Sequence, residues 1–233
     1  MIKGKKILAI VPARGGSKRL PRKNLLPLAG KPMILWSLEA GIKSKYIDKI
    51  VVTSDDSDTI KISRKLDIHT IVRPKKLATD EATTYSAIKH VLENIDDIFD
   101  LIILLQPTSP LRNETHIDKA LEFLDQKKAD AVISVCEMLH NPLRANTLPE
   151  DKSMAGFLKK DRKGKRSQNL PKFFTVNGGI YICRKENYLA EKTFLINKNI
   201  FAFLMDRVSS VDIDEKEDFM IAETFMSNLL NSY

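Results

Sequence analysis

Short apolar runs alternate with longer amphipathic segments along most of this chain of 233 residues. The short runs are typical of β-strands. The longer segments repeat apolar residues at three- and four-residue spacing, which is typical of helices that lay one face on a sheet. This alternation indicates βα units and predicts a doubly wound α/β domain with a mostly parallel sheet. The predicted strands are 6–11, 49–54, 69–72, 101–105, 131–135 and 179–183.

One stretch, residues 139–175, breaks this alternation. It is polar and rich in Lys and Arg, and it holds Pro and Gly at irregular spacing. Loops of this length in a domain are usually functional, disordered or bound to a partner. We therefore predict a single domain over residues 1–233 with an arm inserted at about 139–175. The predicted helices are 32–44, 58–66, 84–95, 116–128 and 215–230.

The charge balance raises the question of nucleic-acid binding. The chain carries 38 Lys and Arg against 30 Asp and Glu, a formal net charge of +8, and such an excess can neutralise a phosphate backbone. The positive charge gathers in two blocks, at 14–23 and 159–172, and no recognisable nucleic-acid module surrounds either one. A small polyphosphate needs the same charges, so we expect no nucleic-acid partner.

Neither a membrane nor a metal–thiolate site is indicated. No apolar stretch approaches the roughly 18–20 residues of a membrane span, and the start of the chain lacks the apolar segment of a signal peptide. We expect a cytoplasmic protein with no membrane partner. Cys136 and Cys183 lie in apolar runs and are expected to be small buried hydrophobes. No Cys and His cluster has the spacing of zinc ligands.

The segment "PARGGSKRLPRKN", residues 12–24, follows the first predicted strand directly. Ligands on open α/β sheets bind beyond the carboxyl ends of strands, which is where this loop begins. Gly15 lets the backbone approach an anion closely, and Arg14, Lys18 and Lys23 can neutralise phosphate oxygens. The spacing matches neither a P-loop nor a dinucleotide fingerprint. The loop predicts a polyphosphate site, and the alternative is a basic loop that is only solvated.

Two carboxylates near the end of the chain are candidate metal ligands. Asp212 and Asp214 in "VDIDEKED" are two residues apart, so on an extended segment both point to one side. Two hard oxygen ligands, completed by water and phosphate oxygens, favour Mg²⁺, with Mn²⁺ as a substitute. The alternative is a solvated acidic run whose charges favour the N-terminus of the following helix.

Several motifs, taken in order, resemble those of the acylneuraminate cytidylyltransferases, the CMP-sialic acid synthetase family. The resemblance extends from residue 7 to about residue 220. It implies a nucleotide-diphospho-sugar transferase-like fold and a homodimer. It also implies that CTP and an acidic nine-carbon sugar react to give a CMP-sugar and pyrophosphate. The motifs are "IVPARGGSKRLPRKNL", "GKPMILWSLEA", "VVTSDD", "RPKKLATDEATT", "LLQPTSPLR", "VNGGIYI" and "VDIDEKED".

The same resemblance implies a role for individual residues. Arg14, Lys23 and Asp214 would be catalytic, and Asp212 and Asp214 would hold the metal. The implied nucleotide-binding residues are Arg14, Gly15, Lys18, Lys23, Asn24, Arg73 and Thr84. The implied or candidate sugar-binding residues are Gln106, Thr108, Arg144, Arg166, Asn177, Tyr181 and Phe194.

Within the sugar-binding set, three residues have a specific expectation. Arg144 and Arg166 are the candidate cations for the carboxylate of the sugar, against plain surface charge. Phe194, together with Arg166, is expected to reach the site of the other subunit through a domain-swapped arm. A lone Tyr in a strand is more often a core residue than a ligand.

Other substrates and another class of protein stay open at this point. The acid sugar is N-acetylneuraminic acid or a related nonulosonic acid. The alternatives are legionaminic, pseudaminic or 3-deoxy-manno-octulosonic acid. The rival from a different class is a nucleic-acid-binding protein on the same α/β scaffold, which would use both basic blocks as its footprint.

Overall fold

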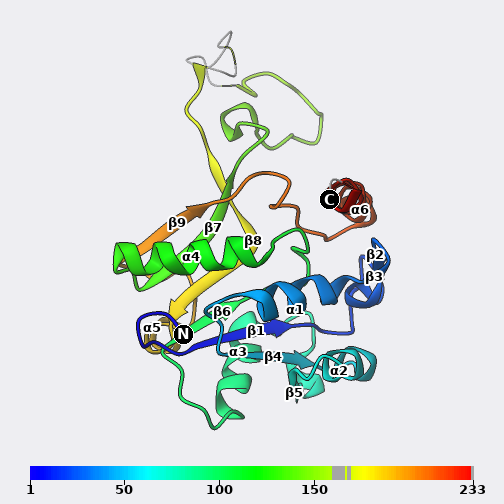
Figure 1. The fold of residues 1–233 in the computed structure, drawn as a ribbon. Coiled ribbons are helices and arrows are strands. Elements are labelled where there is room, and N and C mark those ends of the chain that lie inside the picture. The colour runs from blue at the N-terminus through cyan, green and yellow to red at the C-terminus, as the bar shows by residue number, and fades with distance from the viewer. Residues whose placement is uncertain (159–165, 167–168, 232–233) are drawn as a thin grey trace.

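The computed structural model describes residues 1–158, 166 and 169–231. In the described residues, one large sheet has the strand order β5-β4-β1-β6-β8-β7-β9, and β8 alone is antiparallel to its neighbours (Figure 1). The predicted mostly parallel sheet is therefore confirmed. The strands are β1 Ile7–Pro12, β4 Lys49–Ser54, β5 His69–Val72, β6 Leu101–Leu104, β7 Ala131–Glu137, β8 Phe174–Arg184 and β9 Ile200–Leu204.

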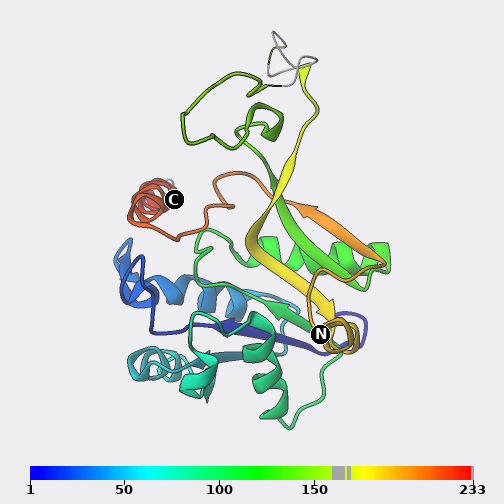
Figure 2. The same ribbon diagram turned by 180° about the vertical axis from the view of Figure 1, so that it is seen from behind.

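Helices cover both faces of this sheet, as a doubly wound domain requires (Figures 1 and 2). Side chains of α1 and α4 pack in one apolar cluster, and those of α3 and α5 pack in the other. The helices are α1 Met33–Lys43, α2 Ser57–Arg64, α3 Thr84–Glu93, α4 Glu114–Lys127, α5 Lys185–Glu191 and α6 Lys216–Asn231. Smaller elements are the hairpin β2 Pro27–Leu28 and β3 Lys31–Pro32, and the 3-10 turns η1 Lys23–Leu25, η2 Lys75–Leu77 and η3 Pro142–Arg144.

The central strands β1 and β6 are buried on both faces, which explains why their sequences are apolar throughout. Residues 7–11 and 101–103 have no exposed surface. Burying a side chain such as Ile or Leu contributes roughly 1.5–3 kcal/mol, so these two strands anchor the domain. The loops that leave their carboxyl ends are therefore fixed to the most rigid part of the sheet.

The strand order reverses between β1 and β6. From β1 the chain moves outward to β4 and β5, and it then returns to place β6 on the other side of β1. In open α/β sheets, such a reversal leaves a crevice at the carboxyl ends of the two strands, because the loops turn away in opposite directions. The basic loop follows β1, and the segment beginning at Gln106 follows β6.

The segment between β7 and β8 projects away from the sheet (Figures 1 and 2). At its base, Met138 N donates to Phe173 O at 2.8 Å, and Lys172 pairs with Glu137 at 2.8 Å. Asn141 Nδ2 also donates to Pro171 O at 2.8 Å. The two ends of this projecting segment, residues 138–173, are thus joined side by side, close to the boundaries predicted for the arm.

Within the described part of the chain, no helix has both the length and the apolar character needed to cross a bilayer. Cys183 is buried and Cys136 is half-buried, and neither forms a disulfide.

Candidate active site

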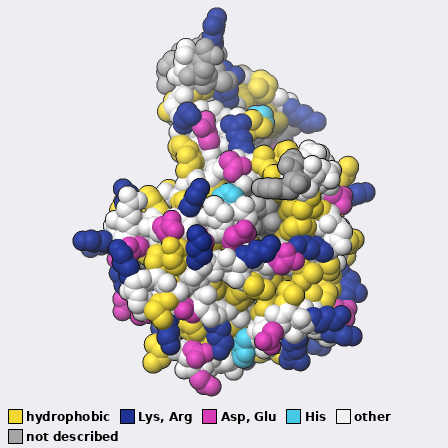
Figure 3. Space-filling model, in the orientation of Figure 1, with side chains coloured by type: hydrophobic (Ala, Val, Ile, Leu, Met, Phe, Trp, Pro, Cys, Tyr) yellow, Lys and Arg dark blue, Asp and Glu magenta, His cyan; other side chains and the backbone are white. Residues whose placement is uncertain are grey.

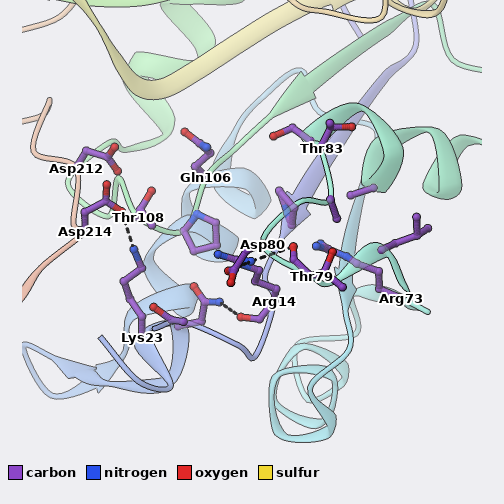
Figure 4. A pocket seen from close by; sticks show the side chains of 18 residues that line it. Arg14, Lys23, Arg73, Thr79, Asp80, Thr83, Gln106, Thr108, Asp212 and Asp214 are labelled. Carbon is purple, nitrogen blue, oxygen red and sulfur yellow. Dashed lines mark hydrogen bonds and ion pairs between the residues drawn. The ribbon is translucent and has the colours of Figure 1, made fainter. Parts of the chain in front are cut away.

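A cavity of about 380 Å³ lies at the reversal between β1 and β6 (Figure 4). Its floor is the end of β1 and the segment after β6, and its rim comes from the basic loop, the loop before α3 and the segment before α6. Most of the residues that the sequence assigned to the nucleotide, the metal and the near part of the sugar line it. These are Arg14, Lys23, Asn24, Arg73, Thr84, Gln106, Thr108, Asp212 and Asp214.

Two cations of the basic loop, Arg14 and Lys18, share one carboxylate. Arg14 Nη1 donates to Asp80 Oδ1 at 2.8 Å and to Thr79 O at 3.1 Å. Lys18 Nζ lies 2.5 Å from Asp80 Oδ2. Hydrogen bonds from Lys18 and then from Arg14 hold the pKa of the Asp80 carboxyl below its usual value, because both partners favour the charged form. Lys18 pairs at the rim and is not part of the cavity lining.

Lys23 faces the acidic wall of the same cavity. Its Nζ donates to Ile213 O at 2.6 Å and lies 3.1 Å from Asp214 Oδ1, and only 12% of its side chain is exposed. Asn24 Nδ2 donates to Arg14 O at 3.0 Å, so its amide nitrogen fixes the backbone of the basic loop. Figure 4 shows Lys23 reaching toward Asp214 from one side of the cavity while Arg14 lies nearer the centre.

Gly15 serves the loop in a different way from the one predicted. Its N–H donates to Asp55 Oδ1 at 2.9 Å, so this amide is engaged by protein rather than directed at the cavity. A Cβ at Gly15 would lie 3.0 Å from Asp56 Cβ. The glycine is therefore needed for close packing of the loop against the end of β4.

Asp212 and Asp214 lie on the same wall of the cavity. Asp212 as a residue is exposed, but its carboxyl is surrounded by protein, and this desolvation raises its pKa. The hydroxyl of Thr108 donates to it and opposes that rise, while the nearby charge of Asp214 adds to it. Thr108 O also accepts from Ile213 N at 2.8 Å, which ties the segment between the two carboxylates to the loop after β6.

The pair fits an oxygen-preferring divalent cation. Both side chains offer hard oxygen donors. Lys23 Nζ already lies 3.1 Å from Asp214 Oδ1, so a metal would share this carboxylate with the ammonium. In the described chain, no group of three His, Cys, Asp or Glu side chains is arranged to hold a metal. A metal on Asp212 and Asp214 would need further oxygens, such as those of a phosphate and of water.

Arg73 lies at the opposite end of the cavity from the two carboxylates (Figure 4). Arg73 is 6% exposed, and its Nη2 donates to Thr53 O at 2.7 Å. Burial lowers its pKa, and the nearby Asp55 opposes the shift. The guanidinium, anchored to β4, thus forms a rigid part of the cavity wall at this end.

Two residues that sequence reasoning did not single out hold this site together. Gly178 has a φ of +76°, and a Cβ there would lie 3.0 Å from Gln106 Oε1 and 3.4 Å from Asp212 Oδ2. The fully buried Arg112 donates through Nε to Gly179 O at 3.1 Å and through Nη2 to Ser37 Oγ at 2.8 Å. Burial lowers its pKa to about 10. Gly178 lies in the motif "VNGGIYI" and Arg112 in "LLQPTSPLR", but neither motif reveals these contacts by its sequence.

Two residues expected to contact the sugar, Asn177 and Phe194, lie outside the cavity lining and have protein partners. Asn177 Oδ1 accepts from Ser134 Oγ, and its Nδ2 donates to Ser210 Oγ at 2.7 Å, so the amide joins β7 and β8 to the segment before Asp212. Phe194 is 6% exposed, and its ring lies 4.5 Å from that of Tyr188. Phe194 thus packs in the core of the domain and lies outside the projecting segment.

Tyr181 and the two candidate arginines also lie outside the cavity lining. The half-buried ring of Tyr181 packs 5.7 Å from Phe194, which is the core role named as more common for such a residue. Arg144 lines a second cavity, of about 680 Å³, inside the projecting segment. Arg166 is exposed on the same segment, most of whose neighbouring residues lie outside the described part.

Comparisons with known proteins cover nearly the whole chain. The sequence profile of the family described as cytidylyltransferase matches residues 8–232. An N-acylneuraminate cytidylyltransferase of Streptococcus agalactiae is 39% identical over 92% of this chain and 52% of its own length. A pseudaminic acid cytidylyltransferase of Campylobacter jejuni is 33% identical over 94% of this chain and 95% of its own length.

A solved structure shares the fold. The CMP:2-keto-3-deoxy-manno-octonic acid synthetase, complexed with CTP, superposes with a TM-score of 0.72 at 19% identity, over 96% of this chain and 99% of that one. The chain spans about half the length of the first curated relatives that it matches. Because the profile match and the relatives cover nearly all of its residues, the chain belongs to the cytidylyltransferase family.

Proposed function

We propose that the protein is a cytidylyltransferase that joins CTP to an acylneuraminate or a related nine-carbon acid sugar, releasing pyrophosphate. The observation that carries this proposal is a single cavity that brings the cations Arg14 and Lys23 together with the carboxylates Asp212 and Asp214. Positive charge suits a triphosphate, and paired carboxylates suit its metal. The curated relatives are named for CMP transfer to acid sugars, which supports the same chemistry here.

In this proposal the nucleotide lies along the floor of the cavity. Its triphosphate contacts Arg14 and Lys23, and its base lies toward Arg73 and Thr84, at the end remote from the carboxylates. The anomeric hydroxyl of the sugar attacks the α-phosphorus, and pyrophosphate leaves. Transfer of this kind asks the protein mainly for positioning and for neutralisation of developing charge. Arg14 and Lys23 supply that charge from two sides of the cavity.

Asp212 and Asp214 would hold Mg²⁺, or Mn²⁺ in its place. The metal, when bound, polarises phosphate oxygens and orients the leaving group. Lys23 beside Asp214 keeps that carboxylate directed into the cavity. Thr108 does the same for Asp212, and Gly178 leaves the room that Asp212 and Gln106 occupy.

The acid sugar would bind next to Gln106 and Thr108, which form the floor at the carboxyl end of β6. The relatives act, by name, on more than one acid sugar, so legionaminic, pseudaminic and 3-deoxy-manno-octulosonic acids remain alternative substrates. Arg144 and Arg166 lie on the projecting segment. They would meet the carboxylate of the sugar in the site of a second subunit.

The proposed assembly is a homodimer, and the base of the projecting segment supports it. Val176 and Leu204 are both cross-strand neighbours of Val135, and they are 43% and 61% exposed. Phe174 at the start of β8 is 48% exposed. Apolar side chains are visible on the surface of this part of the molecule (Figure 3). A contiguous exposed apolar surface is typical of an interaction site.

The compartment proposed for this enzyme is the cytoplasm. Cys136 and Cys183 are both free thiols, which suits the reducing conditions there. Free CTP and a small acid sugar, rather than nucleic acid, would be the partners of the basic loop.

The proposed function is tested by incubating the protein with CTP, Mg²⁺ and a panel of acid sugars, and by following pyrophosphate release. We expect release with at least one nine-carbon acid sugar, a preference for CTP over ATP and GTP, and no release without a sugar. Strong salt-dependent binding to any polynucleotide, with no pyrophosphate released from CTP by any sugar of the panel, would favour the nucleic-acid-binding alternative.

A further inference from the structure

A single carboxylate, that of Asp80, holds two cations of the basic loop, Arg14 and Lys18. Arg14 Nη1 donates to one of its oxygens at 2.8 Å, and Lys18 Nζ lies 2.5 Å from the other. Asp80 comes from the loop between η2 and α3, 66 residues along the chain from Arg14. Figure 4 shows its side chain over Arg14 in the middle of the cavity. The carboxylate therefore occupies the position where the basic loop would receive an anion.

The geometry of these contacts is that of a bound phosphate group. Two oxygens of one anion each accept from a different cation, as two oxygens of a phosphate do when they bridge Arg and Lys. Thr79 O adds a second acceptor for Arg14 at 3.1 Å. The loop before α3 thus presents a set of oxygens to the same donors that the triphosphate needs.

These pairs are strong enough to order the cations but weak enough to exchange. Lys18 and Arg14 hold the pKa of Asp80 below its usual value, so the carboxylate is ionised at neutral pH. The side chains of Arg14, Lys18 and Asp80 are 39%, 83% and 44% exposed. Exposed ion pairs contribute little individually because water screens them. A triphosphate brings several charges to the same donors, and it would displace a single carboxylate.

We propose that Asp80 is a built-in stand-in for a phosphate group, which holds Arg14 and Lys18 in place in the empty cavity and is displaced when nucleotide or pyrophosphate binds. This inference rests on the proposed function, because it assigns the displacing anion to the phosphates of CTP. The carboxylate keeps Arg14 in the cavity and Lys18 at its rim. It also competes with bound pyrophosphate and so favours release of that product.

The test is the direct binding of CTP and, separately, of inorganic pyrophosphate, measured by calorimetry in Mg²⁺ without any sugar. Asp80→Asn keeps the shape of the side chain and removes its charge. The matched control is Glu81→Gln, since Glu81 is exposed and takes part in no ion pair within the described part of the chain. We expect Asp80→Asn to bind both anions roughly threefold to tenfold more tightly than wild type. Glu81→Gln should bind them as wild type does.

The gain should also shrink in high salt, because small ions then screen the freed cations. Unchanged or weaker binding of both anions by Asp80→Asn, in protein shown by its thermal unfolding to be folded, would overturn the inference. An equal gain in Glu81→Gln would overturn it too, because general charge would then explain the effect. Pyrophosphate binding separates the two proposals: tighter pyrophosphate binding by Asp80→Asn without any CMP-sugar formation by wild type supports the stand-in and rejects the proposed function.

Discussion

The cavity and the projecting segment differ in whether their side chains find partners within one chain. In the cavity, each carboxylate that faces a cation of the basic loop is paired, Asp80 with Arg14 and Asp214 with Lys23. At the base of the projecting segment, by contrast, the apolar residue Val176 is 43% exposed. In the proposed account, one subunit supplies the phosphate-binding and metal-binding side chains, and the projecting segment contacts a second subunit.

The largest loss of activity is expected when a carboxylate charge that would hold the metal is removed. Asp214→Asn keeps the volume of the side chain but removes the charge that would hold Mg²⁺, so we expect turnover to fall by orders of magnitude with the fold intact. Steady-state rates and circular dichroism measure the two effects. Glu217→Gln, an exposed neighbour outside the cavity, is the control and should turn over normally. Full activity of any variant in excess chelator would contradict the metal proposal.

Removal of a cation should have the next largest effect. Arg14→Ala should lower kcat by roughly 10²- to 10³-fold, because charge builds on the leaving pyrophosphate during transfer. Lys23→Ala should behave similarly. The split between kcat and KM for CTP decides the role of both residues: an increase in KM alone, at unchanged kcat, would mean that the loop only binds the nucleotide.

The close approach at Gly178 offers a sharper test of how the site is held. Gly178→Ala places a Cβ 3.0 Å from Gln106 Oε1 at a positive φ, so we expect about tenfold lower kcat/KM and a loss of roughly 1 kcal/mol in unfolding free energy. Gly4→Ala is the matched control, since Gly4 has a φ of +78° with nothing within 4 Å. It should lose similar stability and no activity. Equal activity losses in both variants would reject the positioning role.

The projecting segment is tested through assembly. Val176→Asp places a charge in the exposed apolar row, so we expect the dimer dissociation constant to rise about tenfold or more, as seen by sedimentation. Ile98→Asp, at a site that is 77% exposed and distant in sequence, should leave assembly unchanged. The comparison predicts that the monomeric variant still binds CTP but turns over the sugar more slowly. Sedimentation of wild type as a monomer at working concentration would instead remove the basis for a shared site.

The smallest expected effect concerns pH. Burial raises the pKa of Asp212, so this carboxyl takes up a proton, and binds a metal less well, at a higher pH than an ordinary Asp. Thr108→Val removes the hydrogen bond that opposes the rise, and the acid limb of activity should move further toward neutral pH. The Mg²⁺ concentration for half activity, measured against pH, checks this. Thr84→Val, at the other end of the cavity, should not move the limb.

Features that depend on local sequence could be predicted, whereas contacts between distant loops could not. Strand β4 and the position of Arg14 were predictable, because buried apolar runs determine where strands end and the basic loop lies directly after β1. Lys23 and Asp214 do not follow a strand directly, and they were found through the motifs of the family resemblance. The pairing of Asp80 with Arg14 was not predictable, because it joins two loops 66 residues apart whose conformations no local pattern determines.

Elements at the far edge of the sheet were missed for related reasons. α5 has only seven residues and no side-chain cap at Arg184, and β9 follows an irregular stretch and keeps several residues exposed. Phe194 was assigned to a swapped arm, whereas it packs in the core against Tyr188. A ring's partners depend on tertiary packing, which the local sequence does not reveal.

The most direct test of the central claim is the fate of the phosphorus atoms of CTP. Phosphorus NMR of the protein with CTP, Mg²⁺ and an accepted acid sugar should show one pyrophosphate for each new phosphodiester, because the sugar hydroxyl attacks the α-phosphorus. Pyrophosphate should not appear when the sugar is omitted. Formation of CDP with inorganic phosphate, or disappearance of CTP at the same rate without the sugar, would contradict the account.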